Sequence, residues 1–471
     1  LAAKTPFNAC VARPVGNKEI NQAQEAADAV NAEWKRLKAN TVWDETVVRE
    51  WDDVAAEARR NNKKIHFGHV FCICVEKNSE LPKGHKSRKY KGRAVFQGNR
   101  VVDQNWDVAM FQGLGRNPAN MDASRAADCY GCMPGHGIEI ADAEQAYIQA
   151  DLHGTETWVC LPHEARSKDM EGFRKPVVQL RKALYGHPDS GTFWEEHCDK
   201  EARNSGFVPI GPTWPSCYFN TKLKLYLVIY VDDFKLACPT SNLQEGLQLL
   251  RRGLTIEPEK EPGVYLGCMQ ERKELTMKDG RRITTMTYNM EEYLGSCVDR
   301  YIELAGPNTR LNIVPTPFIP EETKDSPAGR PCDVGLMAEC ARCKSTQAVK
   351  HLTCSWCKKE FTPVVSEPSK KKKKATGPEQ AGGLATHPGR TAGEQRGELG
   401  NVAAKVLMKV LYAARLARFD LMRAVCHLAC FITKWSSHCD KISHRLMCYI
   451  HSSKHLRMVG WVGDDPQALQ L

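Results

Sequence analysis

The sequence predicts a mixed α+β protein with more than one domain, and three observations lead to this prediction. The chain has 471 residues, which is more than a single hydrophobic core normally organises. Short apolar runs rich in β-branched and aromatic residues, such as 225–231, are typical of strands. Stretches with apolar residues three or four positions apart, such as 18–40, are typical of amphipathic helices. Because both patterns alternate along the chain, we expect sheets and helices to share domains.

The individual elements follow from the same two periodicities. Residues 1–17 carry no pattern and are predicted to be a disordered linker. Helical spacing predicts helices over 18–40, 45–61, 123–132, 193–204, 242–253, 287–304, 402–418, 419–434 and 440–455. Short apolar or alternating runs predict strands over 64–75, 90–98, 137–142, 157–161, 176–180, 225–231, 234–238 and 263–269. Two hairpins are expected, one joining 64–75 to 90–98 through a basic loop and one over 225–238.

Composition narrows the class of protein. Hydrophobic residues make up 42% of the chain, which predicts that most of it folds. The 66 Lys and Arg residues against 56 Asp and Glu give a net charge of +10, which fits a nucleic-acid partner without requiring one. The 20 cysteines are scattered and no apolar run is long enough to cross a membrane. We therefore expect an intracellular protein with free thiols and no membrane partner.

The most informative stretch is the predicted hairpin with Asp232 and Asp233 at its tip. The apolar run 225–231 ends abruptly at this pair, and a second apolar stretch follows at once. Adjacent carboxylates beside a buried strand repel each other and resist desolvation unless a positive charge compensates them. Two divalent cations would do so, as in two-metal phosphoryl transfer. The alternative is an ordinary solvated turn.

Two further strands end in, or carry, charged side chains. Asp142 closes the predicted strand 137–142, where an acid is a helix N-cap, a metal ligand or both, since 143–149 is predicted to be a helical turn. Lys91 and Arg93 lie on a basic strand. They are either solvated edge charges or a grip for a triphosphate or a nucleic-acid backbone.

Residues 331–400 have the character of an insertion, rich in Pro, Gly, Lys and Thr. Cys340, Cys343, Cys354 and Cys357 form the pattern C-x2-C-x10-C-x2-C, which predicts a tetrahedral structural Zn²⁺ in a small ribbon. The alternative is a loop with unliganded thiols. The run Lys370 to Lys374 is interpreted as a solvated linker, with contact to nucleic acid or a role in nuclear import as the alternative.

In their order along the chain, these stretches resemble the reverse transcriptase of copia-type LTR retrotransposons. The resemblance covers nearly the whole chain apart from 330–395. It rests on the following motifs: Trp34, Leu37, Asn40 and Trp43 (W…L..N.TW); Tyr90 to Gly98 (the basic fingers strand); Asp142, Ala146 and Tyr147 (D…A[FY]); Leu184-Tyr185-Gly186 (ALYG); Tyr230 to Asp233 (YVDD); and Tyr265-Leu266-Gly267 (the FLG-like primer grip). Each motif is weak alone, and their ordered co-occurrence is what identifies the family.

The resemblance implies a right-hand polymerase of fingers, palm and thumb, with an antiparallel palm sheet and C-terminal helices. The zinc-ribbon-like insertion, predicted from the cysteine spacing, is not part of the usual polymerase of this family. Fingers and palm would occupy 18–300, the start of the thumb or connection 301–330, the insertion 331–400, and a helical connection 401–471. The activity would be RNA-directed DNA polymerisation, with an RNA template, a DNA primer and dNTPs as partners. We expect an intracellular location, in a cytoplasmic particle or the nucleus. The polyprotein's ribonuclease H and integrase parts are expected partners that we do not find in this sequence.

The resemblance also assigns roles to single residues. Asp142, Asp232 and Asp233 would hold two Mg²⁺ or Mn²⁺ ions, with Asp232 a firmer choice than Asp233. Lys91 and Arg93 would clamp the triphosphate. The ring of Tyr147 would exclude a 2′-hydroxyl, although plain core packing is an alternative for this residue. Gly186 would let the template approach the backbone closely.

One loop departs from the family pattern. Where the family commonly continues ALYG with Leu-Lys-Gln, this chain has His187-Pro188-Asp189. Contacts to nucleotide or template at this loop are therefore in doubt. The alternative hypothesis is a catalytically inactive retroelement relic that binds nucleic acid or acts as a zinc-dependent interaction protein.

Overall fold

The computed structural model describes residues 12–79, 83–111, 118–306, 308–319, 337–339, 346–348 and 396–463. It confirms a mixed α+β fold. The four cysteines of the predicted zinc site and the lysine run 370–374 lie outside the described residues, so the predicted ribbon and its Zn²⁺ stay predictions. Within the described ranges, no helix combines the length and the apolar character that crossing a membrane requires.

The chain divides into two compact units. The first comprises Leu1–Cys297, Tyr412–Asp420 and Lys454–Leu471, and the second comprises Val298–Leu411 and Leu421–Ser453. All the residues predicted to act on nucleotides fall in the first unit.

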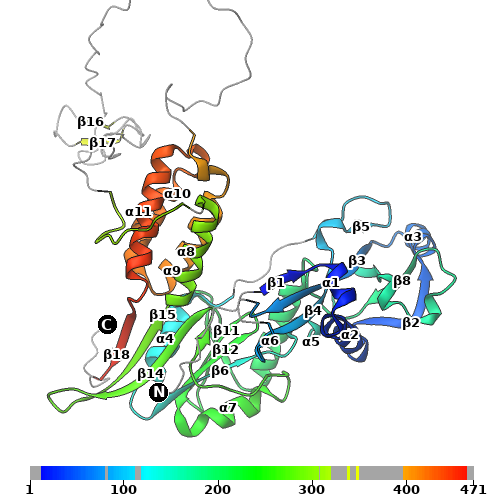
Figure 1. Ribbon diagram of the computed structural model, residues 1–471. Coiled ribbons are helices and arrows are strands. Elements are labelled where there is room, and N and C mark those ends of the chain that lie inside the picture. The colour runs from blue at the N-terminus through cyan, green and yellow to red at the C-terminus, as the bar shows by residue number, and fades with distance from the viewer. Residues whose placement is uncertain are drawn as a thin grey trace, which may run out of the picture. The chain divides into compact units, whose positions relative to one another are not determined.

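The first unit begins with a seven-stranded sheet in the order β1-β3-β7-β8-β2, with β4 and β5 also paired to β3 (Figure 1). Its strands are β1 (Ala12–Val15), β2 (Trp43–Glu50), β3 (Ile65–Lys77), β4 (Lys89–Phe96), β5 (Val102–Asp103), β7 (Glu156–Cys160) and β8 (Pro176–Leu180). The accompanying helices are α1 (Asn17–Gln22), α2 (Gln24–Ala39) and α3 (Trp51–Arg60). Helix α2 packs closely on β4, because a Cβ at Gly92 would stand 2.8 Å from the Ala29 carbonyl oxygen.

The central sheet of this unit is antiparallel, with the strand order β6-β12-β11-β10-β9. Its strands are β6 (His136–Asp142), β9 (Val208–Gly211), β10 (Trp214–Asn220), β11 (Leu225–Tyr230) and β12 (Asp233–Pro239). The helices around it are α4 (Met121–Gly131), α5 (Ala146–Gln149), α6 (Ser190–Asn204) and α7 (Leu243–Leu250). Leu225, Leu227 and Leu236 are fully buried in a core shared with α6 and α7. Burial of these apolar side chains holds β11 and β12 at the centre of the sheet.

A four-stranded sheet completes the unit, in the order β13-β14-β15-β18. Its strands are β13 (Val264–Tyr265), β14 (Cys268–Thr276), β15 (Arg282–Asn289) and β18 (Met458–Val462). Strand β18 joins from far along the chain, pairing Met458 with Tyr288. The sequence did not predict this strand.

The second unit is mainly helical. It contains the later part of α8 (Glu291–Ala305), the earlier part of α9 (Ala403–Leu416), and all of α10 (Met422–Ala429) and α11 (Ser437–Ser453). Two short strands, β16 (Met337–Glu339) and β17 (Thr346–Ala348), pair with each other. The predicted C-terminal helices are thereby confirmed.

Three sequence predictions are wrong in part. Residues 12–15, assigned to the linker, form β1, because Val15 is buried and Arg13 pairs with Glu76 of β3 at 2.8 Å. Residues 45–50, assigned to a helix, belong to β2, which pairs with β8. Residues 287–289 end β15 rather than beginning α8.

Candidate active site

Strand pairing brings two of the predicted carboxylates together. Strand β12 lies antiparallel between β11 and β6, and its register places Asp233 directly opposite Asp142. Residues that face each other across antiparallel strands have Cβ atoms about 5 Å apart. Asp232 is the neighbouring residue in the β11–β12 turn. Because α5 begins at Ala146 with Gln145 as its N-cap residue, the alternative interpretation of Asp142 as a helix N-cap is wrong.

The turn that carries Asp232 is strained. Strands β11 and β12 are joined by only two residues, and Val231 has a φ of 57°. A β-branched residue rarely adopts this left-handed conformation, which costs about 1–2 kcal/mol. Two hydrogen bonds hold the turn in place: the Trp194 indole donates to the Val231 carbonyl oxygen at 2.6 Å, and Ala143 N donates to Asp232 O at 2.7 Å. Strain held in this way is common at functional sites.

The ionisation of Asp233 is strongly affected by its surroundings. The pKa of Asp233 is raised to about 7, first by burial and then by the negative charges of Asp232 and Asp142. A hydrogen bond with Asp142 raises this pKa further. Near neutral pH the Asp233 carboxyl group is therefore about half protonated, which identifies a place where positive charge would be favourable.

The donor set fits a hard divalent cation. Carboxylate oxygens are the ligands that Mg²⁺ and Mn²⁺ prefer, with water and substrate phosphate supplying the rest of the coordination. Over the ranges that the structure describes, no three His, Cys, Asp or Glu side chains are already arranged to hold an ion. Asp142 and Asp233 thus offer a facing pair of ligands, and Asp232 is the adjacent third.

A row of aromatic and basic side chains leads away from the carboxylates. The Tyr147 ring meets the Tyr185 ring edge-on, with 4.6 Å between centroids, and the Arg93 guanidinium lies 5.3 Å from the Tyr185 centroid. Burial raises the pKa of both tyrosines, and the charge of Asp232 adds to this effect. The structure therefore places Tyr147 and Arg93 in one row that begins beside Asp232.

Lys91 is two residues from Arg93 on the same face of β4. Burial lowers the pKa of the Lys91 ammonium, and the nearby charges of Arg93, Lys77 and Arg36 lower it further. A half-buried lysine among other cations is a favourable place for an anion.

Gly186 has a local reason to be glycine. Its φ is 87°, and a Cβ there would stand 2.2 Å from the carbonyl oxygen of Phe96 at the end of β4. The close backbone approach seen at Gly186 is thus an approach to the chain's own β4. A contact between Gly186 and a template stays a prediction.

In the loop 187–189, which departs from the family pattern, the His187 ring packs against two phenylalanine rings. The His187 ring lies 4.9 Å from the Phe96 ring and 5.4 Å from the Phe111 ring between centroids, and the residue is 6% exposed. Burial lowers the pKa of His187 to about 4, and nearby His66 lowers it further. His187 is therefore neutral at physiological pH and fills a core position.

Sequence reasoning missed a buried ion pair beneath the hairpin. Lys235 is fully buried, and its ammonium group binds Asp128 Oδ1 at 2.8 Å, Gln270 Oε1 at 2.8 Å and Ser124 Oγ at 2.9 Å. Tyr288 donates a hydrogen bond of 2.8 Å to the other oxygen of Asp128. The signal in the sequence was a lysine inside the apolar stretch 234–238. We name these five residues the Lys235 cluster; it joins β12 to α4, β14 and β15.

A search against models of known protein families finds no match to this chain.

Proposed function

We propose that this protein is an RNA-directed DNA polymerase of the copia type, which extends a DNA primer on an RNA template with dNTPs. The observation that carries the proposal is the register of β12 against β6, which sets Asp233 opposite Asp142 at the end of a buried sheet. Two carboxylates from separate strands, with a third in a strained turn, are the donor set that two-metal phosphoryl transfer requires.

The surrounding side chains suit a nucleotide. Divalent cations held by Asp142, Asp232 and Asp233 would activate the primer 3′-hydroxyl and neutralise charge on the triphosphate. Arg93 and Lys91 supply positive charge for triphosphate oxygens. Tyr147, whose ring contacts Tyr185 beside Arg93, would leave no room for a 2′-hydroxyl. The fingers, palm and thumb assignment belongs to the same proposal.

Primer extension on poly(rA)/oligo(dT) with Mg²⁺ or Mn²⁺ tests the proposal. The full chain is compared with a D232N/D233N variant and with Asp169→Asn, which changes an exposed acid away from the sheet. We expect extension by the parent and by Asp169→Asn, and none by D232N/D233N. Equal activity in all three chains would remove the carboxylates from the mechanism.

The same experiment addresses the rival hypothesis of an inactive relic. The His187 loop favours that rival, because the polar residues common in the family are replaced by a buried, neutral histidine. A folded parent that binds primer-template but does not extend it would support the relic. Binding measured by fluorescence anisotropy on the same preparation separates this outcome from misfolding.

A further inference from the structure

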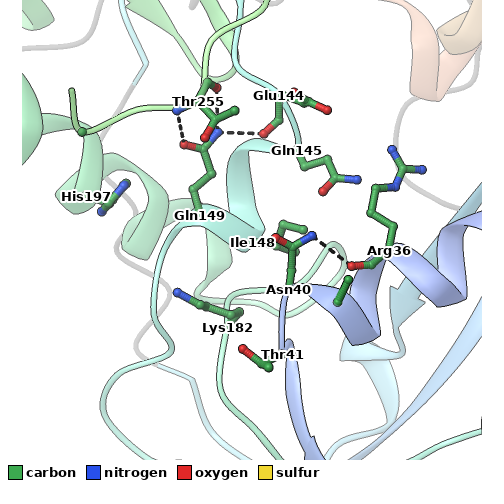
Figure 2. Close-up of a pocket in the computed structure, with 12 residues that line it drawn as sticks. Arg36, Asn40, Thr41, Glu144, Gln145, Ile148, Gln149, Lys182, His197 and Thr255 are labelled. Carbon is green, nitrogen blue, oxygen red and sulfur yellow. Dashed lines mark hydrogen bonds between the residues drawn. The ribbon is translucent and has the colours of Figure 1, made fainter. Parts of the chain in front are cut away.

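A polar cavity borders the segment that carries Asp142 and Tyr147, with Glu144 and Gln145 in its lining. Its volume is about 630 Å³, and residues from separate parts of the first unit line it. Figure 2 shows the side chains that surround the cavity, among them Arg36, Gln145, Gln149, Lys182, His197 and Thr255. None of these residues takes part in the proposed chemistry at the carboxylates.

Basic groups reach this cavity from three elements. Arg36 comes from α2, His197 from α6, and Lys182 from the segment that follows β8, whereas Glu144 is the one carboxylate in the lining. The pKa of His197 is lowered by burial, and the charge of Lys182 lowers it further. His197 is therefore a neutral imidazole near pH 7, and the charged lining groups are the two cations Arg36 and Lys182 and the carboxylate Glu144.

Arg36 and Lys182 each have more N–H donors than their protein partners use. Arg36 binds Glu33 at 2.6 Å, and exchanging the Gln145 amide oxygen and nitrogen lets that oxygen accept from Nη1 at 2.7 Å and from Nε at 2.5 Å. Lys182 binds Asp151 at 2.7 Å. A guanidinium has five N–H donors and an ammonium three, so neither group is exhausted by these partners. The side chains of Arg36 and Lys182 are 41% and 27% exposed, which leaves both accessible to a solute.

Two residues that line the cavity have strained backbone conformations. Thr41 and Gln145 both line the cavity, and their φ values are 47° and 53°. The left-handed conformation is costly for Thr41 in particular, because threonine is β-branched. Strained residues of this kind gather at ligand clamps and active sites. This observation is independent of the charges.

We propose that this cavity binds a small phosphate-bearing anion, at a site separate from the carboxylates. The Arg36 fork and the Lys182 ammonium would bind phosphate oxygens, since these groups make the strongest charge-assisted hydrogen bonds to them. The amide and hydroxyl groups of Asn40, Thr41 and Thr255 are available to a sugar or a second phosphate. The volume is suited to a nucleoside monophosphate or to pyrophosphate.

The cavity is connected to the candidate active site through α5. Gln149 donates to the carbonyl oxygens of Glu144 and Thr255 at 2.7 and 2.9 Å, and it accepts from Thr255 N at 2.9 Å. Gln145 lies between Asp142 and Tyr147 in the sequence. A bound anion would therefore contact the segment that positions both residues.

Isothermal titration of the full chain with pyrophosphate and with AMP tests this proposal. The titrations are made in EDTA and repeated on the D232N/D233N variant, so that the carboxylates and any metal make no contribution. Arg36→Met and Lys182→Met are the test variants. Lys35→Met is the matched control, because Lys35 is an exposed neighbour of Arg36 that does not line the cavity.

We expect binding of about one anion per chain, weakened on the order of tenfold or more by Arg36→Met and by Lys182→Met. Lys35→Met should bind as the parent does. Equal binding of the two probes would identify phosphate alone as the ligand, and tighter binding of AMP would add the nucleoside. Absence of binding by the folded parent, or equal affinity in all variants with unchanged thermal unfolding, would overturn the proposal. Because no step depends on catalysis, failure of primer extension leaves this result unaffected.

Discussion

Strand β12 borders two acidic sites, one at Asp128 of α4 and one at its own Asp233, and they differ in their partners. Asp128, which faces Lys235 beneath the sheet, has a buried cation and a tyrosine hydroxyl as partners. Asp233, two residues before Lys235, faces only another carboxylate. The first site contains its own cation, whereas the pKa of Asp233 is raised first by burial and then by the charges of Asp232 and Asp142. Lys235 is the one lysine of β12, and it pairs with Asp128 rather than with Asp233. We infer that the positive charge for the second site comes from a bound species.

The largest expected effect comes from neutralising Asp233. Asp233→Asn should lower the rate of primer extension on the order of a thousandfold, because one ligand for the cations is lost. The same change removes a carboxylate that is repelled by its neighbours, so the free energy of unfolding without metal should rise by about 1 kcal/mol. Steady-state extension and urea denaturation in EDTA measure the two effects. A variant that is both inactive and strongly destabilised would show that Asp233 is a structural residue.

The second prediction removes the cation that pairs with Asp128. Lys235→Met leaves the Asp128 carboxylate buried without its cation, which should lower the free energy of unfolding by about 3–5 kcal/mol. The double variant Lys235→Met/Asp128→Asn should recover part of this loss. Lys273→Met is the control, since Lys273 forms an exposed pair with Glu271 and its loss should change stability by less than about 0.5 kcal/mol. A loss of less than about 1 kcal/mol in Lys235→Met would contradict the assignment of Lys235 as the buried partner of Asp128.

His187 is a third buried ionisable group, and unlike Asp128 and Asp233 it is uncharged at neutral pH. Its pKa of about 4 in the folded protein lies below the ordinary value of 6.5, so the unfolded chain binds the proton first as the pH falls. Stability is therefore fully present above about pH 6.5 and is lost between pH 6.5 and 4, with a total of about 3 kcal/mol. Thermal unfolding between pH 7 and 4 measures the slope.

His187→Asn is the control for this prediction. It keeps an acceptor near the position of Nδ1, which receives the Asp189 N–H at 3.2 Å, and it cannot ionise. Its pH slope should be shallower than that of the parent by the contribution of His187. Identical slopes in the two chains would show that His187 does not account for the acid sensitivity.

The smallest expected effect concerns the strained turn. Val231→Gly relieves about 1–2 kcal/mol of left-handed strain and adds about 0.5–1 kcal/mol of unfolded-state freedom. The free energy of unfolding should therefore rise by at most about 1.5 kcal/mol. Val228→Gly, in the buried middle of β11, should instead destabilise the chain by several times this amount. If Val231→Gly destabilises the protein as much as Val228→Gly does, strain is not the dominant property of this turn.

The hairpin was predictable because its signal is local. An apolar run that ends in two acids specifies a buried strand and a polar turn within a dozen residues. The facing of Asp142 and Asp233 was implied by the family resemblance only, since the register of β6 against β12 joins residues about ninety positions apart. The Lys235 cluster was missed because the partners of Lys235 come from three other elements, α4, β14 and β15, and a lone lysine in a strand is ordinarily a solvated one.

Long-range pairing also explains the errors in the fold. Residues 45–50 contain apolar side chains at spacings compatible with a helix or a strand, and pairing with β8 decides between them. Strand β18 is five residues long and pairs with a strand about 170 positions earlier, so its own sequence does not specify it. The polar cavity is hidden from sequence analysis for the same reason, since its lining is contributed by separate segments.

The crossing of β4 and the loop at Gly186 restricts how the site can move. Phe96 N donates to Tyr185 O at 2.7 Å, and the space for a methyl group is missing both at Gly186 and at Gly98. The two backbones are in contact, so neither can slide past the other. Any swing of the ribbon that carries Lys91 and Arg93 must therefore carry Tyr185 along with it. Strand β4 and Tyr185 therefore move together, and any hinge has to lie outside the contact between Phe96 and Gly186.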